Sequence, residues 1–123
     1  MFRKYFTPLE ANRRLPLIRQ IVEDILVKGQ EYRKIMHAHE GKEEPQQGRQ
    51  LIEEVEALME ELENLGCYYK DWNFSIGLVD FPALIENREV FLCWRSDEKD
   101  VRFYHPVEAG YAGRTPIPQE LLN

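Results

Sequence analysis

The chain has 123 residues, of which 43% are apolar and 31% charged, and its formal net charge is −6. This length suits one domain and is too short for a second independent core. Nucleic acid is not an expected partner, because phosphate contact needs clustered Lys and Arg. No apolar run approaches the ~20 residues of a membrane span. Two cysteines without a CxxC motif favour a reducing compartment, so we expect a cytoplasmic protein without membrane association.

Residues 7–66 predict a helical hairpin. Thr7 and Glu10 form a capping box around Pro8, which suits the first position of a helix. Pro16 lacks an N–H donor, so a break or kink is expected there. Beyond it, apolar residues at helical spacing form a stripe about 180° wide.

A polar turn at residues 40–45 precedes a second helix over residues 46–65, and Gly66 is its predicted C-terminal cap. The apolar residues of this helix follow a coiled-coil spacing: Leu51, Val55, Leu58, Leu62 and Leu65. Residues 1–40 hold eight bases and five acids, whereas residues 41–66 hold two bases and eight acids. This opposite charge favours antiparallel pairing of the two helices.

Alternating apolar residues predict a three-stranded antiparallel meander over residues 77–105, with four-residue turns at 86–89 and 96–99. These turn lengths would align Phe81 with Trp94 and Val101 on one face, and Asp80 with Arg95 and Asp100 on the other. His105 would lie on the apolar face. Pro82 would make the first strand an edge strand.

The expected fold class is α+β: a long, coiled-coil-like antiparallel helical hairpin packed with this small meander. The aromatic connection at residues 67–76 would pack the base of the hairpin onto the sheet. Residues 106–123 read as a loop, with a helical turn at 119–123. We expect residues 1–123 to form a single domain.

Motifs along nearly the whole chain resemble one family. They are Tyr5-Phe-Thr-x-x-Glu-Ala-Asn12, Gly77-Leu-Val-Asp-Phe-Pro82, Glu89-Val-x-Leu-Cys-Trp94 and Gly110-x-x-Gly-Arg-x-Pro-Ile117. The family they resemble is the small prokaryotic domain of unknown function 2203. The resemblance implies a bacterial or archaeal cytoplasmic protein and assigns no activity.

The sharpest polar constellation consists of Asp80, Arg95, His105 and Arg114. Asp80 and His105 are candidate catalytic residues, the carboxylate being paired with Arg95 in the predicted register. The candidate ligand-binding residues are Arg95, Arg114, Gly110 and Gly113, since glycine backbone and arginine together suit an anion. The alternative interpretation is a structural ion pair beside a histidine at the sheet margin.

No metal or cofactor is expected. His37 and His39 are two residues apart and point to different sides of a helix. Cys67 and Cys93 lack companion ligands in sequence, and Cys93 reads as a structural thiol.

Two functional hypotheses remain open. The first is an interaction or assembly module without enzymatic activity, in which the wide apolar stripe of the hairpin forms a homodimer. The second is a binding protein or enzyme for a small anionic ligand, with its site at the sheet margin around Asp80, Arg95, His105 and Arg114.

Overall fold

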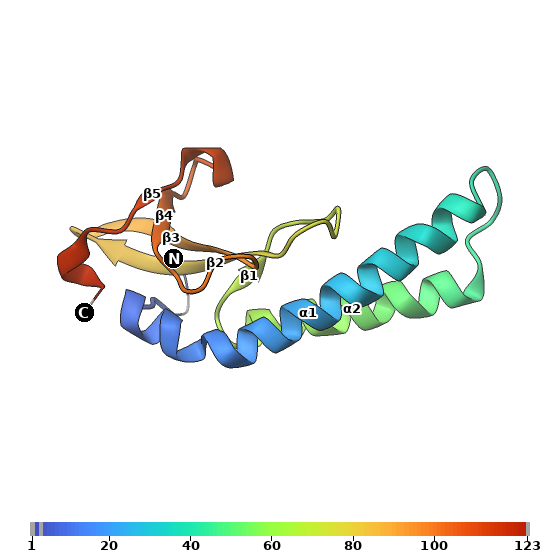
Figure 1. The fold of residues 1–123 in the computed structure, drawn as a ribbon, viewed down its shortest axis with the longest axis horizontal. Helices are drawn as coiled ribbons and strands as arrows, with labels where there is room; N and C mark the ends of the chain where they lie inside the picture. Colours follow the sequence, from blue (N-terminus) through green and yellow to red (C-terminus); the bar gives the residue numbers. More distant parts are fainter. Residues whose placement is uncertain (1, 3, 123) are drawn as a thin grey trace.

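A computed structural model of the chain describes residue 2 and residues 4–122 (Figure 1). Within this part, α1 (Pro8–Ala38) and α2 (Gln46–Asn64) precede a five-stranded antiparallel sheet. The strands are β1 (Tyr68–Tyr69), β2 (Leu78–Ile85), β3 (Arg88–Arg95), β4 (Phe103–Pro106) and β5 (Thr115–Pro116), side by side in chain order. The α+β class is confirmed, whereas the meander has five strands instead of three.

The C-terminal segment is more ordered than the predicted loop. It contains β5 and two 3₁₀ turns, η1 (Tyr111–Gly113) and η2 (Gln119–Leu121). The predicted limits of the chain's domain at residues 1 and 123, and the end of the predicted final turn, lie outside the described residues.

Helix α1 begins at the predicted capping box, in which Glu10 N–H donates to Thr7 Oγ1 and Thr7 N–H donates to Glu10 Oε1. Of the break or kink expected at Pro16, the break is wrong, because α1 continues through this residue as one helix. Leu15 and Ile18 on either side are buried in the core, so packing holds the helix together across the missing hydrogen bond.

Helix α2 ends as predicted. Gly66 adopts a φ of 97°, with its N–H on Glu63 O at 2.9 Å and the Cys67 N–H on Leu62 O at 3.0 Å. These two bonds form a Schellman motif, which needs a left-handed residue that glycine supplies. The chain reverses between the helices (Figure 1), and Lys28 Nζ bonds Glu54 Oε1 across them at 2.8 Å.

The predicted coiled-coil seam is not matched in detail. The buried residues of α2 are Gly48, Val55, Met59 and Leu62. Leu51, Leu58 and Leu65 of the expected seam are half-buried. Helix α2 contacts β1 as well as α1, so its buried face does not follow the narrow stripe of a two-helix seam.

The turn between β2 and β3 has two residues instead of the predicted four. Glu86 and Asn87 have φ values of 53° and 63°, which is the backbone of a tight type I′ hairpin turn. Phe81 therefore pairs with Leu92 and not with Trp94. Because the shift is an even number of residues, each side chain keeps its predicted face.

Strand β2 is not an edge strand, since β1 pairs with its first half. Pro82 lies just beyond that pairing, and its carbonyl accepts the N–H of Phe6 at 2.7 Å. Pro82 has no N–H to donate, and at this position no neighbouring strand of the described sheet requires one.

The connection between β3 and β4 changes the face of β4. Trp94 Nε1 donates to Glu98 O at 3.0 Å and Arg95 N–H donates to Glu98 Oε1 at 2.8 Å. These bonds shape a longer connection than a four-residue turn, and β4 begins only at Phe103. His105 pairs with Phe91, one residue away from the predicted register.

A one-residue shift reverses the faces of a strand. The prediction that His105 lies on the apolar face is therefore wrong: it lies on the outer face, with Phe91 and Cys93. The predicted pairing of Asp80 with Arg95 is also wrong, because Asp80 is opposite Cys93 and Arg95 is opposite Leu78.

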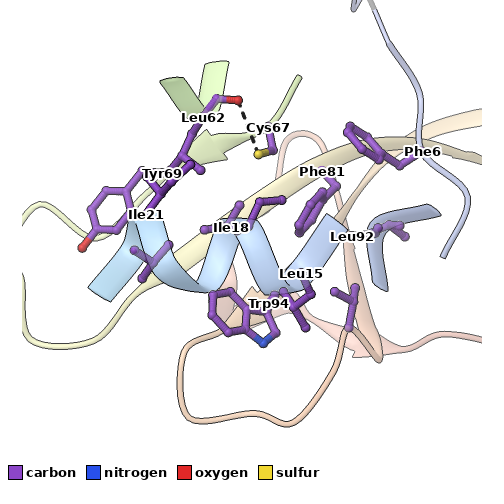
Figure 2. Close-up of a cluster of buried hydrophobic side chains, with 14 of the residues drawn as sticks. Phe6, Leu15, Ile18, Ile21, Leu62, Cys67, Tyr69, Phe81, Leu92 and Trp94 are labelled. Atoms are coloured by element: carbon purple, nitrogen blue, oxygen red, sulfur yellow. Dashed lines mark hydrogen bonds between the residues drawn. The ribbon is translucent and has the colours of Figure 1, made fainter. Parts of the chain in front are cut away.

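The core lies between the base of the hairpin and the inner face of the sheet (Figure 2). Trp94, Phe81, Ile18 and Leu62 are among its largest fully buried side chains. Tyr69 and Phe74 of the aromatic connection are buried there too, as predicted. In the part of the chain that the structure describes, no helix combines the length and the apolar character that a membrane crossing requires.

Candidate functional site

The outer face of the sheet carries the two polar side chains that are buried among the described residues. Asp80 on β2 is 4% exposed and His105 on β4 is 3% exposed. Each comes from a separate strand, and their side chains meet above β3 because both point away from the helices. Burial of two ionisable groups is costly, which marks this face as a candidate site.

The contacts of His105 place a hydrogen on one of its ring nitrogens. Nδ1 lies 2.8 Å from the carbonyl oxygen of Pro106, and Nε2 lies 3.1 Å from Asp80 Oδ1. A carbonyl oxygen accepts only, so Nδ1 carries a hydrogen. Nε2 therefore faces the Asp80 carboxyl group. A hydrogen bond between them requires a proton either on Nε2 or on the carboxyl group.

Burial raises the pKa of the Asp80 carboxyl group, while His105 and the Lys70 ammonium oppose the rise. Burial and the nearby Asp80 raise the pKa of the Cys93 thiol to about 12. Cys93 is therefore a protonated thiol near neutral pH, and as it stands it is not a nucleophile.

A cavity of about 290 Å³ opens over these residues. Its lining combines apolar side chains with the buried polar ones: Lys70, Leu78, Asp80, Phe91, Cys93, His105, Val107, Ala109, Gly110 and Tyr111. The segment after β4 thus forms one wall, and the sheet forms the floor. A cavity of this size holds a small ligand.

A larger hollow of about 770 Å³ lies between α1 and residues 74 and 75. Gln30 and Arg33 line it, and both already donate to backbone carbonyls, of Phe74 and Asn73 respectively. No buried polar side chain of the described residues lines this hollow. The smaller cavity is therefore the better candidate site.

The sequence-predicted residues divide into two groups. Asp80, His105 and Gly110 line the cavity, whereas Arg95, Arg114 and Gly113 are not among its described lining residues. The side chain of Arg95 bonds Asp97 at 2.5 Å and also donates to the Tyr111 hydroxyl.

Arg114 is occupied by a carboxylate. It donates to both oxygens of Glu98, at 2.8 and 2.7 Å, and stacks 4.0 Å above the ring centroid of Phe103. Its charge acts on Cys93, so it lies near the site without lining the cavity. The expected meeting of all four polar residues is therefore limited to Asp80 and His105.

Sequence reasoning missed Lys70, Cys93 and Tyr111 as lining residues. A two-residue turn at Glu86 and Asn87 would have aligned Cys93 with Asp80. The sequence there lacks the glycine that normally signals such a turn. Lys70 lies in an irregular connection and Tyr111 begins the short 3₁₀ turn η1, and no periodic pattern in the sequence predicts the placement of either.

The same cluster groups three metal-ligating residue types. One ligand atom each from Asp80, Cys93 and His105 lies within 4.8 Å of the others. The expectation that Cys93 lacks companion ligands is therefore wrong, because the fold places Asp80 and His105 beside it. His37 and His39 lie at the exposed end of α1, and His39 Nδ1 lies 2.9 Å from Ile35 O.

A family model described as an uncharacterized conserved protein matches residues 4–117, almost the whole chain. The chain belongs to the DUF2203 family. No curated protein and no solved structure matches it. The matched range of this DUF2203 protein includes every residue that lines the cavity. The family description assigns no activity.

Proposed function

We propose that the protein binds a small ligand with an anionic group in the cavity over Asp80, Cys93 and His105. The observation that carries this proposal is the buried Asp80–His105 contact of 3.1 Å at the floor of a cavity. Convergent buried polar groups in a largely apolar hollow are typical of ligand sites.

Lys70 supports the anionic character of the ligand. Its ammonium group lies 5.4 Å from the ring centroid of Phe91, above the same face of the sheet. Among the described lining residues, Lys70 and Asp80 carry the formal charges, and Asp80 is already engaged by His105. The Lys70 ammonium group is therefore the positive charge that would pair with the carboxylate or phosphate of a ligand.

The test is a titration of the ¹⁵N-labelled protein with malonate and, separately, with inorganic phosphate. We expect saturable chemical-shift changes confined to the backbone around residues 78–80, 91–93 and 105–111. Lys70→Ala should weaken binding about tenfold, which corresponds to an ion pair of about 1.4 kcal/mol. Lys42→Ala is the matched control, because Lys42 is exposed at the tip of the hairpin.

Shifts that do not saturate with either anion, or that persist unchanged in Lys70→Ala, would contradict the proposed anion site. Equal weakening in Lys42→Ala would show a general charge effect instead of a specific counter-ion.

Self-association through the hairpin is the second candidate function. Between Gly29 and Val55, Gly48 is the one buried residue of the described chain. Apolar residues of this stretch are half-buried, including Tyr32, Ile35, Met36, Leu51 and Ile52. The two helices here extend beyond the sheet (Figure 1), and a second hairpin would cover these side chains in a four-helix arrangement.

Light scattering at tens of micromolar protein tests this candidate. We expect twice the chain mass for the wild type and a reduced mass for Ile52→Glu. Leu84→Glu makes a comparable apolar-to-acidic change at an exposed leucine on the sheet, so it should leave the mass unchanged. A wild-type protein that stays monomeric would overturn self-association.

A further inference from the structure

The Asp80, Cys93 and His105 cluster has the ligand chemistry of a transition-metal site. Thiolate and imidazole ligands suit zinc and similar divalent transition-metal ions, called zinc-class ions below. Magnesium and calcium prefer ligand sets made of oxygen atoms alone. The three side chains come from neighbouring strands β2, β3 and β4. A rigid sheet therefore presents one sulfur, one nitrogen and one oxygen to a common point.

The orientation of His105 is an independent indication. A metal-bound histidine usually donates its other ring N–H to a carbonyl or carboxylate oxygen, which directs the free nitrogen at the ion. His105 has this arrangement, with Nδ1 2.8 Å from Pro106 O and Nε2 facing the cluster. Without an ion, a proton bridges Nε2 and Asp80 Oδ1 at 3.1 Å, and a bound cation would take the place of that proton.

The distances suit an ion after small side-chain rotations. Ligand atoms bind zinc at about 2.0–2.3 Å, so atoms on one tetrahedral ion lie less than about 4 Å apart. The three atoms already lie within 4.8 Å of one another. A carboxylate from Asp80 and a thiolate from Cys93 would together balance the charge of a divalent ion, with the thiol proton released on binding.

We infer that Asp80, Cys93 and His105 bind a divalent zinc-class ion and leave its fourth position open to the cavity. Three protein ligands with an open position are typical of catalytic and ligand-binding zinc sites, whereas structural sites are closed. This inference rests on the ligand site proposed above, since the open position would meet the ligand's anionic group.

Cobalt(II) titration of the EDTA-treated full-length protein tests the inference, because cobalt reports its ligands by absorption. We expect one equivalent to produce the thiolate-to-cobalt charge-transfer band in the near ultraviolet and the intense visible bands of a four-coordinate ion. Zinc should displace cobalt and abolish both features. A folded wild-type protein that gives neither band overturns the inference.

Variants assign the ligands. Cys93→Ser should remove the charge-transfer band, and His105→Gln should weaken cobalt binding at least tenfold. Cys67→Ala is the matched control, because Cys67 is the other buried free cysteine and lies outside the cluster. A charge-transfer band that survives in Cys93→Ser, or is lost in folded Cys67→Ala, contradicts the assignment.

Circular dichroism checks that each variant folds. If Cys93→Ser does not fold, X-ray absorption of the wild-type zinc complex decides the matter. One sulfur among nitrogen and oxygen ligands supports the inference, and a shell without sulfur overturns it.

Malonate separates the two proposals. Cobalt bands without malonate support the metal site whether or not malonate binds later. Malonate binding to the metal-free protein, with no cobalt bands, supports the proposed ligand site and overturns the metal site alone. A change in the visible bands on malonate addition supports an open coordination position, and unchanged bands at saturating malonate contradict it.

Discussion

Gly29 lies where the aromatic connection crosses α1. A Cβ atom at this position would lie 2.2 Å from Cγ of Phe74, at the base of the ring. Phe74 is buried and has a φ of 57°, so neither its backbone nor its ring can move away freely. Close approach of the ring therefore requires glycine here, although glycine weakens a helix.

The first prediction compares two helical glycines. Gly29→Ala should lower the free energy of unfolding by about 1–3 kcal/mol through overpacking. Gly48→Ala should raise it by up to about 1 kcal/mol through helix propensity, because its Cβ would meet Met36 Sδ at an ordinary 3.4 Å. Guanidinium denaturation measures both, and an unchanged or more stable Gly29→Ala would contradict the packing argument.

The fold does not need the buried Asp80–His105 pair for its stability, because apolar residues can often replace such a pair. Both groups lose their hydration, and each satisfies the other at 3.1 Å. Removing one partner leaves the other buried without it, whereas replacing both with apolar residues avoids that cost. If the pair serves binding, the double replacement should be tolerated by the fold.

We therefore predict that His105→Leu alone destabilises the protein by about 3 kcal/mol. The double variant Asp80→Leu and His105→Leu should recover at least half of that loss, because no buried polar group is then left unpaired. Urea denaturation of the two single variants and the double variant gives the coupling. A double variant as unstable as the sum of the singles would show that the two side chains are not coupled, which would contradict this account of the pair.

At the scale of elements, the turn between β2 and β3 decides the register of the sheet. Both of its residues adopt positive φ, which costs about 1 kcal/mol for a residue with a Cβ atom. Asn87 tolerates this conformation and Glu86 does so poorly. The hairpin forms because its paired residues bury a continuous inner face, with Val79, Phe81 and Leu92 fully buried.

The turn prediction follows from these angles. Replacing Glu86 and Asn87 by Asn and Gly should raise the free energy of unfolding by about 1 kcal/mol. Asn87→Val should lower it by about as much, because a branched Cβ is strained at a φ of 63°. Thermal denaturation of the wild type and the two variants compares their stabilities. An Asn87→Val variant more stable than the wild type would refute the assigned turn.

At the scale of the whole molecule, burial is concentrated at one end of the hairpin. Buried residues of α1 run from Pro8 to Gly29, and its remaining residues are exposed or half-buried. The hairpin extends past the sheet over this second part (Figure 1). Local stability follows local burial, so the two ends of one helix should differ in opening free energy.

Hydrogen exchange measures that difference. At concentrations where light scattering gives the chain mass, amides of residues 30–38 should exchange at least tenfold faster than amides of residues 18–25, which lie over the core. If the hairpins associate, the fast amides should slow as the protein concentration rises. Uniform protection along α1 at all concentrations would contradict both statements.

Local signals in the sequence determined the helical part of this protein. The Thr7 capping box, the helix from Gln46 and the Gly66 cap are confirmed, because capping depends on residues a few positions apart. Alternation also identified the inner face of β2 and β3, since side chains in a strand alternate with period two.

Tertiary structure alone decided the register of β4, and with it the site. A one-residue difference in a connection moves His105 from the core face to the outer face, where it meets Asp80 and Cys93. Packing likewise carried α1 through Pro16, against its local preference. Such outcomes depend on contacts between residues far apart in the chain, and no short-range pattern encodes the geometry of those contacts.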